Sequence, residues 1–308
     1  MEVSDGHISK TILNRFKEIN YDDGLRLIND LINNYNIEIN NIIDIIRNLS
    51  QNKNENIYEI LKYIYENKSE LNIYTNLDFS TVIHATASNN NVELLKDMFD
   101  DGVDINYKDV SEYTPLMEAC LKENYAFDSI KFLVENNADI NYVCTHIDAE
   151  DGQYCALSLL IKKCKDSNID QLLEIIEYLL NSNADPNIKI EYPHDDSLLI
   201  NVITNTKIND VNKIRIMNLL VSKGANINIR DYENNSLLMK VFKISKSKHY
   251  FYNDDHKFNK YIKSMKNMIM YLMRNGADTN ICNMYDENVF DIIEKEEHMK
   301  IIRMYIDE

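Results

Sequence analysis

The sequence predicts an all-α protein of about seven helix–turn–helix repeats, followed by a terminal capping helix pair. Three observations predict this fold. A five-residue pattern that begins with Gly or Asn and ends with Asn recurs five times. An amphipathic stretch with apolar residues at helical spacing precedes every copy. Glycine (6) and proline (3) are scarce among the 308 residues, which argues against a loop-rich β protein.

The recurring pattern marks the end of a helix. Its copies lie at residues 102–106, 137–141, 183–187, 224–228 and 276–280. The first residue is Gly or Asn, the types that tolerate the left-handed conformation found just after a helix end. We therefore expect a helix, a left-handed cap and a short extended segment in every copy. The final Asn recurs with a base period of about 33 residues, which insertions lengthen in the later units.

A second segment, upstream of each long helix, marks the start of a shorter one. Its clearest copy is Thr114-Pro115-Leu116, and Thr81 stands in a similar segment that includes His84. A Ser or Thr before Pro or an apolar run is a helix-start signal. The weaker copies begin at Cys155, Ser197 and Ser236. Each unit therefore reads as a turn, a short helix, a second turn, a longer helix and a cap.

A unit of about 33 residues that carries T-P-L-H-x-A and then G-A-D-x-N resembles the ankyrin repeat. Residues 75–282 carry these motifs, with insertions around 144–154, 162–170 and 245–263. Residues 1–74 resemble divergent N-terminal ankyrin-like repeats, and residues 283–308 resemble a C-terminal capping repeat. The resemblance implies that the motif His, kept at His84, supports a hydrogen bond between neighbouring turns. We expect looser junctions where that His is replaced, as by Met239.

The charge balance disfavours nucleic acid and anionic membranes as partners. The chain has 50 acidic and 33 basic side chains, a net charge of -17, whereas phosphate binding needs Lys and Arg. No run reaches the ~18 apolar residues of a membrane span, and the polar, acidic N-terminus is unlike a secretory signal. Five cysteines without a C-x-x-C pair fit a reduced protein of the cytoplasm or the nucleus. We expect a monomer.

No catalytic motif occurs, so we expect no enzyme activity, catalytic residue or cofactor. Cys144, His146, Cys155 and Cys164 lie in one repeat and could hold zinc by ligand type. The usual paired spacing is absent and Cys155 stands at a helix-start position, so buried thiols are the favoured interpretation and we expect no metal. Residues 240–266 combine eight lysines with aromatic residues. They could contact an acidic partner, but a solvated inserted loop is favoured.

The resemblance implies protein binding through the turn tips and the exposed side of the first helix of each repeat. Tips are expected near residues 109–113, 146–153, 191–196, 231–234 and 284–287. The candidate partner-binding residues are Tyr113, Glu118, Asp151, Tyr192, Asp195, Asn201, Tyr232, Lys240, Lys246 and Tyr250. Tyrosine favours interfaces because it offers contact area at little entropic cost. Acidic tips suggest a partly basic partner.

The abundance of Asn, Ile, Lys and Tyr is typical of an AT-rich genome, and the divergent repeats resemble those of poxvirus and giant-DNA-virus ankyrin proteins. That resemblance implies a host-range or immune-evasion factor that binds and blocks a host protein. The resemblance also implies an alternative, a substrate adaptor that uses an F-box-like segment to recruit a ubiquitin ligase. We expect no such segment, because the sequence ends on a partial repeat, and this expectation disfavours the adaptor. Another alternative is a metal-binding or enzymatic protein that uses the insertions.

Overall fold

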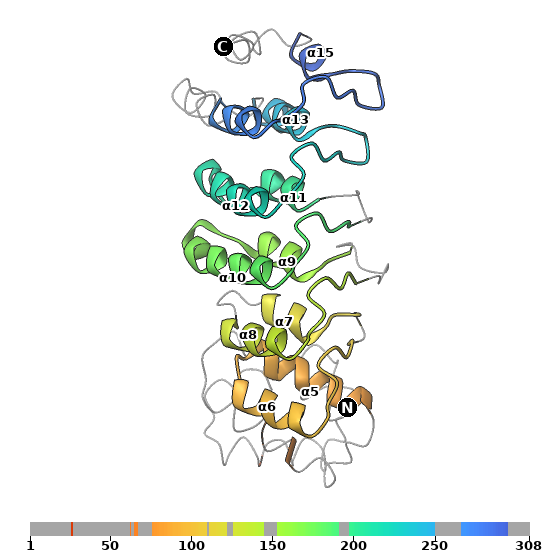
Figure 1. The fold of residues 1–308 in the computed structure, drawn as a ribbon, viewed down its shortest axis with the longest axis vertical. Coiled ribbons are helices and arrows are strands. Elements are labelled where there is room, and N and C mark those ends of the chain that lie inside the picture. The colour runs from red at the N-terminus through yellow and green to blue at the C-terminus, as the bar shows by residue number, and fades with distance from the viewer. Residues whose placement is uncertain are drawn as a thin grey trace, which may run out of the picture. The chain divides into compact units, whose positions relative to one another are not determined.

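The computed structural model describes residues 26, 62, 65, 66, 76–109, 111–121, 126–144, 153–190, 197–249 and 266–294. These residues form helices joined by turns, and their extended backbone is limited to isolated bridges such as that between Arg230 and Ser236. The expected all-α fold of helix–turn–helix repeats is confirmed in this part of the chain. The chain divides into two compact units, Met1–Cys144 and Thr145–Glu308. Figure 1 labels the helices of both units and colours them by residue number.

The first unit contains two described helix pairs. Its helices are α5 (Asn76–Ser88), α6 (Val92–Asp100), α7 (Pro115–Leu121) and α8 (Phe127–Glu135). The first helices α5 and α7 pack together, as do the second helices α6 and α8. Leu94, Leu95 and Met98 lie on one face of α6 at helical spacing and are almost fully buried. Tyr65, from the chain before these pairs, donates a 2.6 Å hydrogen bond to the Asp101 carboxylate at the end of α6.

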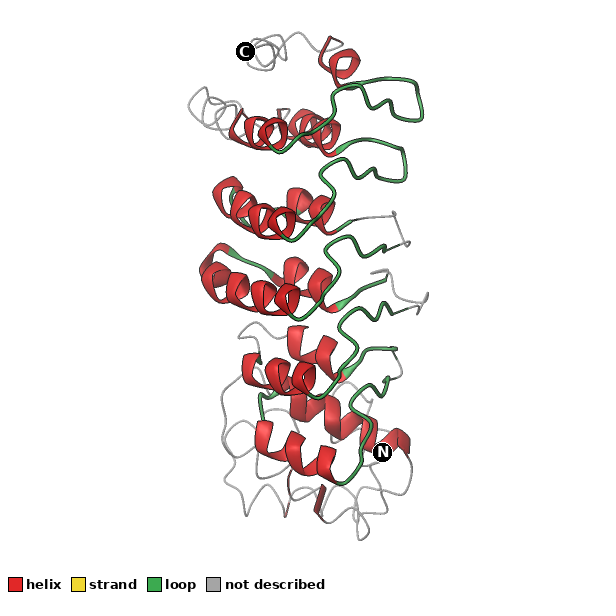
Figure 2. Cartoon of the chain, in the orientation of Figure 1, coloured by secondary structure: helices red, strands yellow, loops and turns green. Residues whose placement is uncertain are grey.

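The second unit repeats this arrangement. Its elements are α9 (Ala156–Lys163), the 3-10 turn η1 (Asp166–Asn168), α10 (Ile169–Asn181), α11 (Leu198–Thr204), α12 (Asp210–Ser222), α13 (Leu237–His249), a helix over residues 266–274 and α15 (Val289–Glu294). First helices pack in the order α9, α11, α13 and α15, and α10 packs on α12. Within each unit the turns project on the side of the first helices, as Figure 2 shows.

The left-handed caps are confirmed in all five copies of the pattern. The first residue has a φ of 85° at Gly102, 69° at Asn137, 70° at Asn183, 92° at Gly224 and 84° at Gly276. The N–H of the next residue then bonds back to a carbonyl in the last helical turn; Ala138 reaches Leu133 at 2.9 Å. This bond satisfies a carbonyl that has no partner inside the helix. The cap therefore fixes where each helix ends and where the chain turns.

The first helices begin on equivalent side-chain caps. Thr114 Oγ1, Ser197 Oγ and Ser236 Oγ each accept an N–H from the residue three positions later, all at 3.3 Å. Cys155 stands at the same position, and its Sγ accepts from the Ser158 N–H at 3.4 Å. The expectation that Cys155 replaces the helix-start Thr agrees with this geometry. Its thiol serves as a cap inside the protein, where its side chain is buried.

The last Asn of the pattern joins one repeat to the next. Asn106 Nδ2 donates to the Asn137 carbonyl at 3.2 Å, while Asn106 Oδ1 accepts the Asp139 N–H at 2.7 Å. Asn187 and Asn228 form the same pair of bonds with the next copy of the pattern, at 2.7–3.1 Å. We call this two-bond contact the Asn clamp. It satisfies one backbone acceptor and one backbone donor of the following cap with a single side chain.

Another side chain caps a helix of the neighbouring repeat. The residue before α8 is Ala126, which has no side-chain acceptor. Asn90, at the turn between α5 and α6, instead accepts the Ser129 N–H of α8 at 2.8 Å. Asn90 itself has a φ of 57°, a conformation that Asn adopts more readily than most residues. The end of one helix pair therefore supplies the start signal that the next helix lacks.

The insertions expected from the repeat spacing differ in structure. Residues 162–170 include the end of α9, the turn η1 and the start of α10. The segment expected around 245–263 begins inside α13, which runs to His249 and is a longer helix than α7, α9 or α11. The first part of that insertion is therefore helix, not loop, and its remainder lies outside the described residues. The same holds for most of 144–154 and for the residues of 283–308 that follow α15.

Within the described ranges, no group of metal-binding side chains comes together. Cys144, Cys155 and Cys164 are buried free thiols, whereas His146 falls outside these ranges. Burial raises the pKa of the Cys164 thiol to about 12, so the thiol is protonated at neutral pH. Among the described helices, none combines the length and apolar character needed to cross a bilayer.

Candidate interaction surface

Three described turns share one five-residue design, in which an Asp or Asn side chain holds the backbone. They span residues 109–113, 231–235 and 283–287. In each, the N–H of the first residue donates to the carbonyl of the fifth at 2.9–3.0 Å. The first side chain accepts the N–H groups of the third and fifth residues at 2.8–3.1 Å. Such Asx-held turns are stiff because one side chain satisfies several backbone donors.

The fourth residue of each turn adopts the left-handed conformation, with a φ of 59° at Glu112, 60° at Asn234 and 56° at Asp286. The backbone therefore reverses at this point, and the residues just before it stand at the tip. In the second unit these tip residues carry large apolar groups. Tyr232 is 53% exposed, Met284 57% and Tyr285 60%. We call these three side chains the tip patch.

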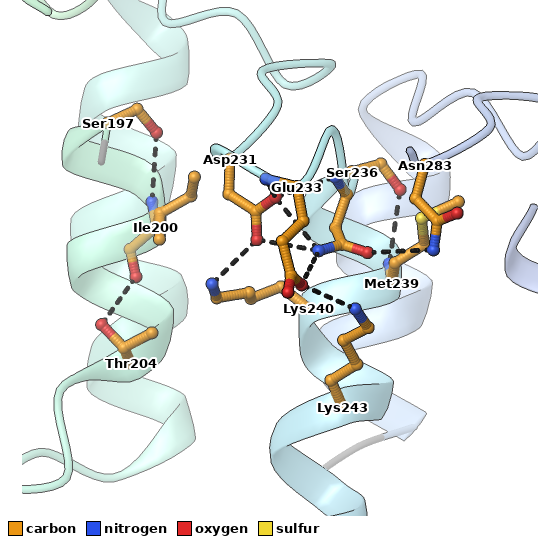
Figure 3. Close-up of polar contacts among 11 residues, drawn as sticks. Ser197, Ile200, Thr204, Asp231, Glu233, Ser236, Met239, Lys240, Lys243 and Asn283 are labelled. Carbon is orange, nitrogen blue, oxygen red and sulfur yellow. Dashed lines mark hydrogen bonds and ion pairs between the residues drawn. The ribbon is translucent and has the colours of Figure 1, made fainter. Parts of the chain in front are cut away.

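Two lysines of α13 hold the turn at residues 231–235 from the helix side (Figure 3). Lys240 Nζ lies 2.9 Å from Asp231 Oδ2, and Lys243 Nζ lies 3.0 Å from Glu233 Oε2. The amide of Asn235 donates to both carboxylates at 2.9–3.0 Å. The Asp231 side chain is fully buried, so its charge needs these partners. The lysines thus fix the turn to the helix that follows it.

The pKa values of these carboxyl groups follow from their surroundings. Burial acts to raise the pKa of Asp231, but hydrogen bonds from Asn235 and Lys240, with the charge of Lys240, outweigh it and hold the pKa below its usual value. The Lys243 hydrogen bond, followed by that of Asn235, lowers the pKa of Glu233. Both groups are therefore ionised at neutral pH, which keeps the two ion pairs intact.

The turns at residues 231–235 and 283–287 are joined directly. The Met284 N–H donates to the Glu233 carbonyl at 2.9 Å. The Asn283 amide donates to Asn235 Oδ1 at 3.3 Å and to Glu287 Oε2 at 3.1 Å. Asn283 and Asn235 are both buried. The two turns therefore form one hydrogen-bonded surface that carries the tip patch.

In the first unit, a histidine connects neighbouring turns. His84 is fully buried in α5, and its Nε2–H donates to the Tyr113 carbonyl at 2.7 Å. This is the bond that the motif His was expected to form. In the second unit Met239 stands where the His would be, yet Asn283 and the Met284 N–H join the adjacent turns there. The groups that replace the His bond, one side-chain amide and one backbone N–H, thus come from the turns themselves. The looser junction expected at Met239 is therefore not seen in the hydrogen bonds between these two turns.

The structure places the predicted partner-binding residues in different environments. Tyr113 is partly exposed at its turn, and Asn201 is partly exposed on α11. Tyr232 is well exposed, and Lys240 lies 6.0 Å from the centre of its ring. Lys240 is committed to Asp231 and its side chain is only 20% exposed, so it acts first as a support for the turn.

One expectation needs correction. Glu118 was expected to face outward from the first helix, but it is only 4% exposed. Glu118 lies in α7, where every residue from Pro115 to Cys120 is buried. The short helix is covered by its neighbours on all of these positions. Lys246 lies in α13, whose side chains at that point are not described. The remaining candidates lie outside the described residues and stay predictions: Asp151, Tyr192, Asp195 and Tyr250.

Five residues of this surface were not among the individual candidates: Glu233, Asn235, Asn283, Met284 and Tyr285. Glu233, Met284 and Tyr285 do lie within the expected tips at 231–234 and 284–287, whereas Asn235 and Asn283 lie just outside them. Part of the signal was present in the sequence. An Asp or Asn begins all three turns, and an Asn or Asp, which tolerates the left-handed conformation, stands fourth in the turns at 231–235 and 283–287. Alignment of those segments places Met284 and Tyr285 at the same tip positions as Tyr232 and Glu233.

Comparison with known proteins agrees with this geometry. Residues 49–144 match the family model for ankyrin repeats (three copies). A search of the curated proteins found no significant match. The ankyrin repeat domain of Bcl-3, a member of the IkappaB protein family, is 18% identical, and the alignment covers 80% of this chain and 92% of that one with a TM-score of 0.51.

Two bacterial structures are similar to the same degree. An ankyrin repeat domain from Acinetobacter baumannii AYE is 16% identical over 73% of this chain and 95% of that one, with a TM-score of 0.52. A chain from a complex of a predatory endopeptidase of Bdellovibrio bacteriovorus with an immunity protein is 17% identical over 73% and 97%, with a TM-score of 0.50. Ankyrin repeats typically mediate protein–protein interactions, and their fold is generally a non-enzymatic scaffold. Residues 49–144 therefore match the ankyrin repeat family, and the chain has the ankyrin-repeat fold.

Proposed function

We propose that this chain is a non-enzymatic scaffold that binds one cellular protein through its turn tips and the first helices of its repeats, and that it blocks that protein's other contacts. The observation that carries the proposal is the tip patch on two turns fixed by hydrogen bonds. A preformed surface loses little conformational entropy on binding, so contacts made by its side chains convert well into affinity. A stable complex of this kind buries about 800 Å² on each partner.

The charged groups beside the tip patch support a binding role over a catalytic one. Lys240 is paired with Asp231 and Lys243 with Glu233. The hydrogen bonds on both carboxylates lower their pKa values, so neither is poised to exchange a proton near neutral pH. These charged groups hold the turn, and the Tyr232, Met284 and Tyr285 side chains are exposed to solvent at the tip.

The finer proposal is that the partner is a host protein and that the chain is a viral host-range or immune-evasion factor acting in the cytoplasm or the nucleus. Its support is the resemblance in composition and in repeat divergence to viral ankyrin proteins. Direct sequestration would then be the mechanism, because occupancy of a rigid surface is enough to exclude a competing ligand.

The test is affinity capture with the full chain, followed by reconstitution. Immobilised protein is incubated with host-cell lysate, retained proteins are quantified by mass spectrometry, and the best candidate is purified and titrated by calorimetry. A stoichiometric complex that also displaces a natural ligand of the candidate supports sequestration. Recovery of cullin subunits together with loss of the partner in cells favours the adaptor alternative. Failure of every purified candidate to bind contradicts the scaffold proposal.

A further inference from the structure

The exposed apolar side chains of the described residues are unevenly distributed. Phe99 and Val211 belong to separate helices, and Phe99 contacts the Phe132 ring edge-to-face with ring centres 6.1 Å apart. Tyr232, Met284 and Tyr285 instead lie on two turns that a backbone hydrogen bond joins. Large apolar groups gathered on a protein surface indicate an interaction site, whereas single ones are ordinary. The tip patch is therefore the strongest feature that folding does not explain.

The chemistry of the tip patch limits what can bind it. Tyrosine rings and a methionine thioether contact aliphatic, aromatic and cationic groups well. Asp286, which follows Tyr285, is exposed and forms no ion pair within the described part of the chain. The nearby lysines of α13 are already neutralised by Asp231 and Glu233.

One exposed basic residue lies close by in sequence. Arg230 forms the bridge with Ser236 at the base of the turn at residues 231–235, so it is not one of the tip residues. The charge beside the tip patch itself therefore comes from Asp286. A carboxylate next to aromatic faces attracts a cation by both charge and ring quadrupole.

We infer that the tip patch binds a protein segment that presents an arginine or lysine next to aliphatic or aromatic side chains. The inference rests on the proposed scaffold function and names the chemistry of its partner. The apolar neighbours pack against Met284 and the tyrosine rings, and the cation lies near Asp286. Electrostatic complementarity of this kind sets which partner is accepted more than how tightly it binds.

The test uses a random peptide library displayed on phage, which is panned against the full chain. The variant with Tyr232→Ser, Met284→Ser and Tyr285→Ser removes the patch from exposed positions, so circular dichroism and the unfolding midpoint should match the wild type. The control variant is Val211→Ser, which removes an exposed apolar side chain from α12 (67% exposed) and leaves the tips intact.

We expect recovered peptides to share a basic residue flanked by apolar ones, to lose at least about tenfold in affinity for the triple variant and to keep it for Val211→Ser. Asp286→Lys should weaken the same peptides. Peptides that bind the triple variant as well as the wild type, acidic peptides, or no tip-dependent peptide at all would overturn the inference. The scaffold proposal would still stand if the reconstituted partner bound the triple variant unchanged, and it fails on its own if no partner binds.

Discussion

Replacement of the Asn clamps by alanine should weaken the coupling between repeats. In Asn228→Ala, the Gly276 carbonyl and the Asp278 N–H lose partners at 3.1 and 2.8 Å. A hydrogen bond contributes about 0.5–1.5 kcal/mol net, and both groups are exposed enough for water to replace the amide. The loss should therefore be near the lower limit for two bonds, about 1 kcal/mol. Asn106→Ala and Asn187→Ala should cost the same because their clamps are equivalent.

The measurement is urea unfolding followed by circular dichroism. The Asn106 clamp shares no residue with the other two, but the clamps of Asn187 and Asn228 meet in the cap at residues 224–228, where Asn187 accepts the Asn226 N–H and Asn226 Oδ1 accepts the Asn228 N–H. The triple variant should lose about 3 kcal/mol if the effects add, and the Asn187/Asn228 double variant measures any coupling between those two clamps. Its transition should also broaden, because weaker contact between neighbours lowers the cooperativity of a repeat protein. The matched control is Asn280→Ala, at the same position in the last copy of the pattern, where no described residue bonds the amide. Equal losses for Asn280→Ala and Asn228→Ala would show that the clamp does not stabilise the stack.

Three further outcomes follow from the described geometry. A Cβ at Gly102 would meet no atom within 4 Å, so only the φ of 85° restricts the residue type there. Gly102→Asn should therefore leave the free energy of unfolding nearly unchanged, whereas Gly102→Val should lower it by about 1–2 kcal/mol. Chemical denaturation measures both changes. Lys240→Met should cost about 2 kcal/mol at pH 7 by leaving the buried Asp231 carboxylate without its cation. The pKa of Asp231 is lower in the folded protein than its value of about 4 in the unfolded chain, so its ionised form stabilises the fold above that pH. The stability lost in Lys240→Met should therefore shrink as the pH falls and Asp231 becomes protonated. Thermal unfolding of both proteins between pH 3 and 7 measures this trend. Native protein should react with a thiol reagent at Cys282, the exposed cysteine, while the four buried thiols react only after unfolding.

The elements that sequence reasoning predicted best depend on local backbone rules. A left-handed cap needs Gly or Asn at one position, and all five predicted positions have a positive φ. A first helix needs a side-chain acceptor at its start, which Thr114, Ser197 and Ser236 provide. Both signals act within a few residues, so they can be read without knowing what packs against the helix.

The features that sequence reasoning missed depend on partners far away in the chain. An Asn can donate and accept, but nothing local shows that Asn106 bonds a cap more than thirty residues later. Glu118 was expected to be exposed because of its position on a first helix, yet its burial is decided by the helices that cover α7. Lys240 looked like a contact residue, but its ammonium is held by a turn that precedes it. Residue type gives bonding capacity, and the fold decides which partner uses it.

The turn design separates the residues that fold the chain from those that can recognise a partner. The first residue of each turn accepts two N–H groups, and the fourth must tolerate a left-handed backbone. The side chain of the second residue meets neither demand, so Tyr232 and Met284 can occupy it although they differ in shape and polarity. Exposed Tyr and Met side chains leave apolar surface in water, which favours association. Their presence on turns held this firmly is therefore explained more simply by contact with another protein than by stability of the repeat.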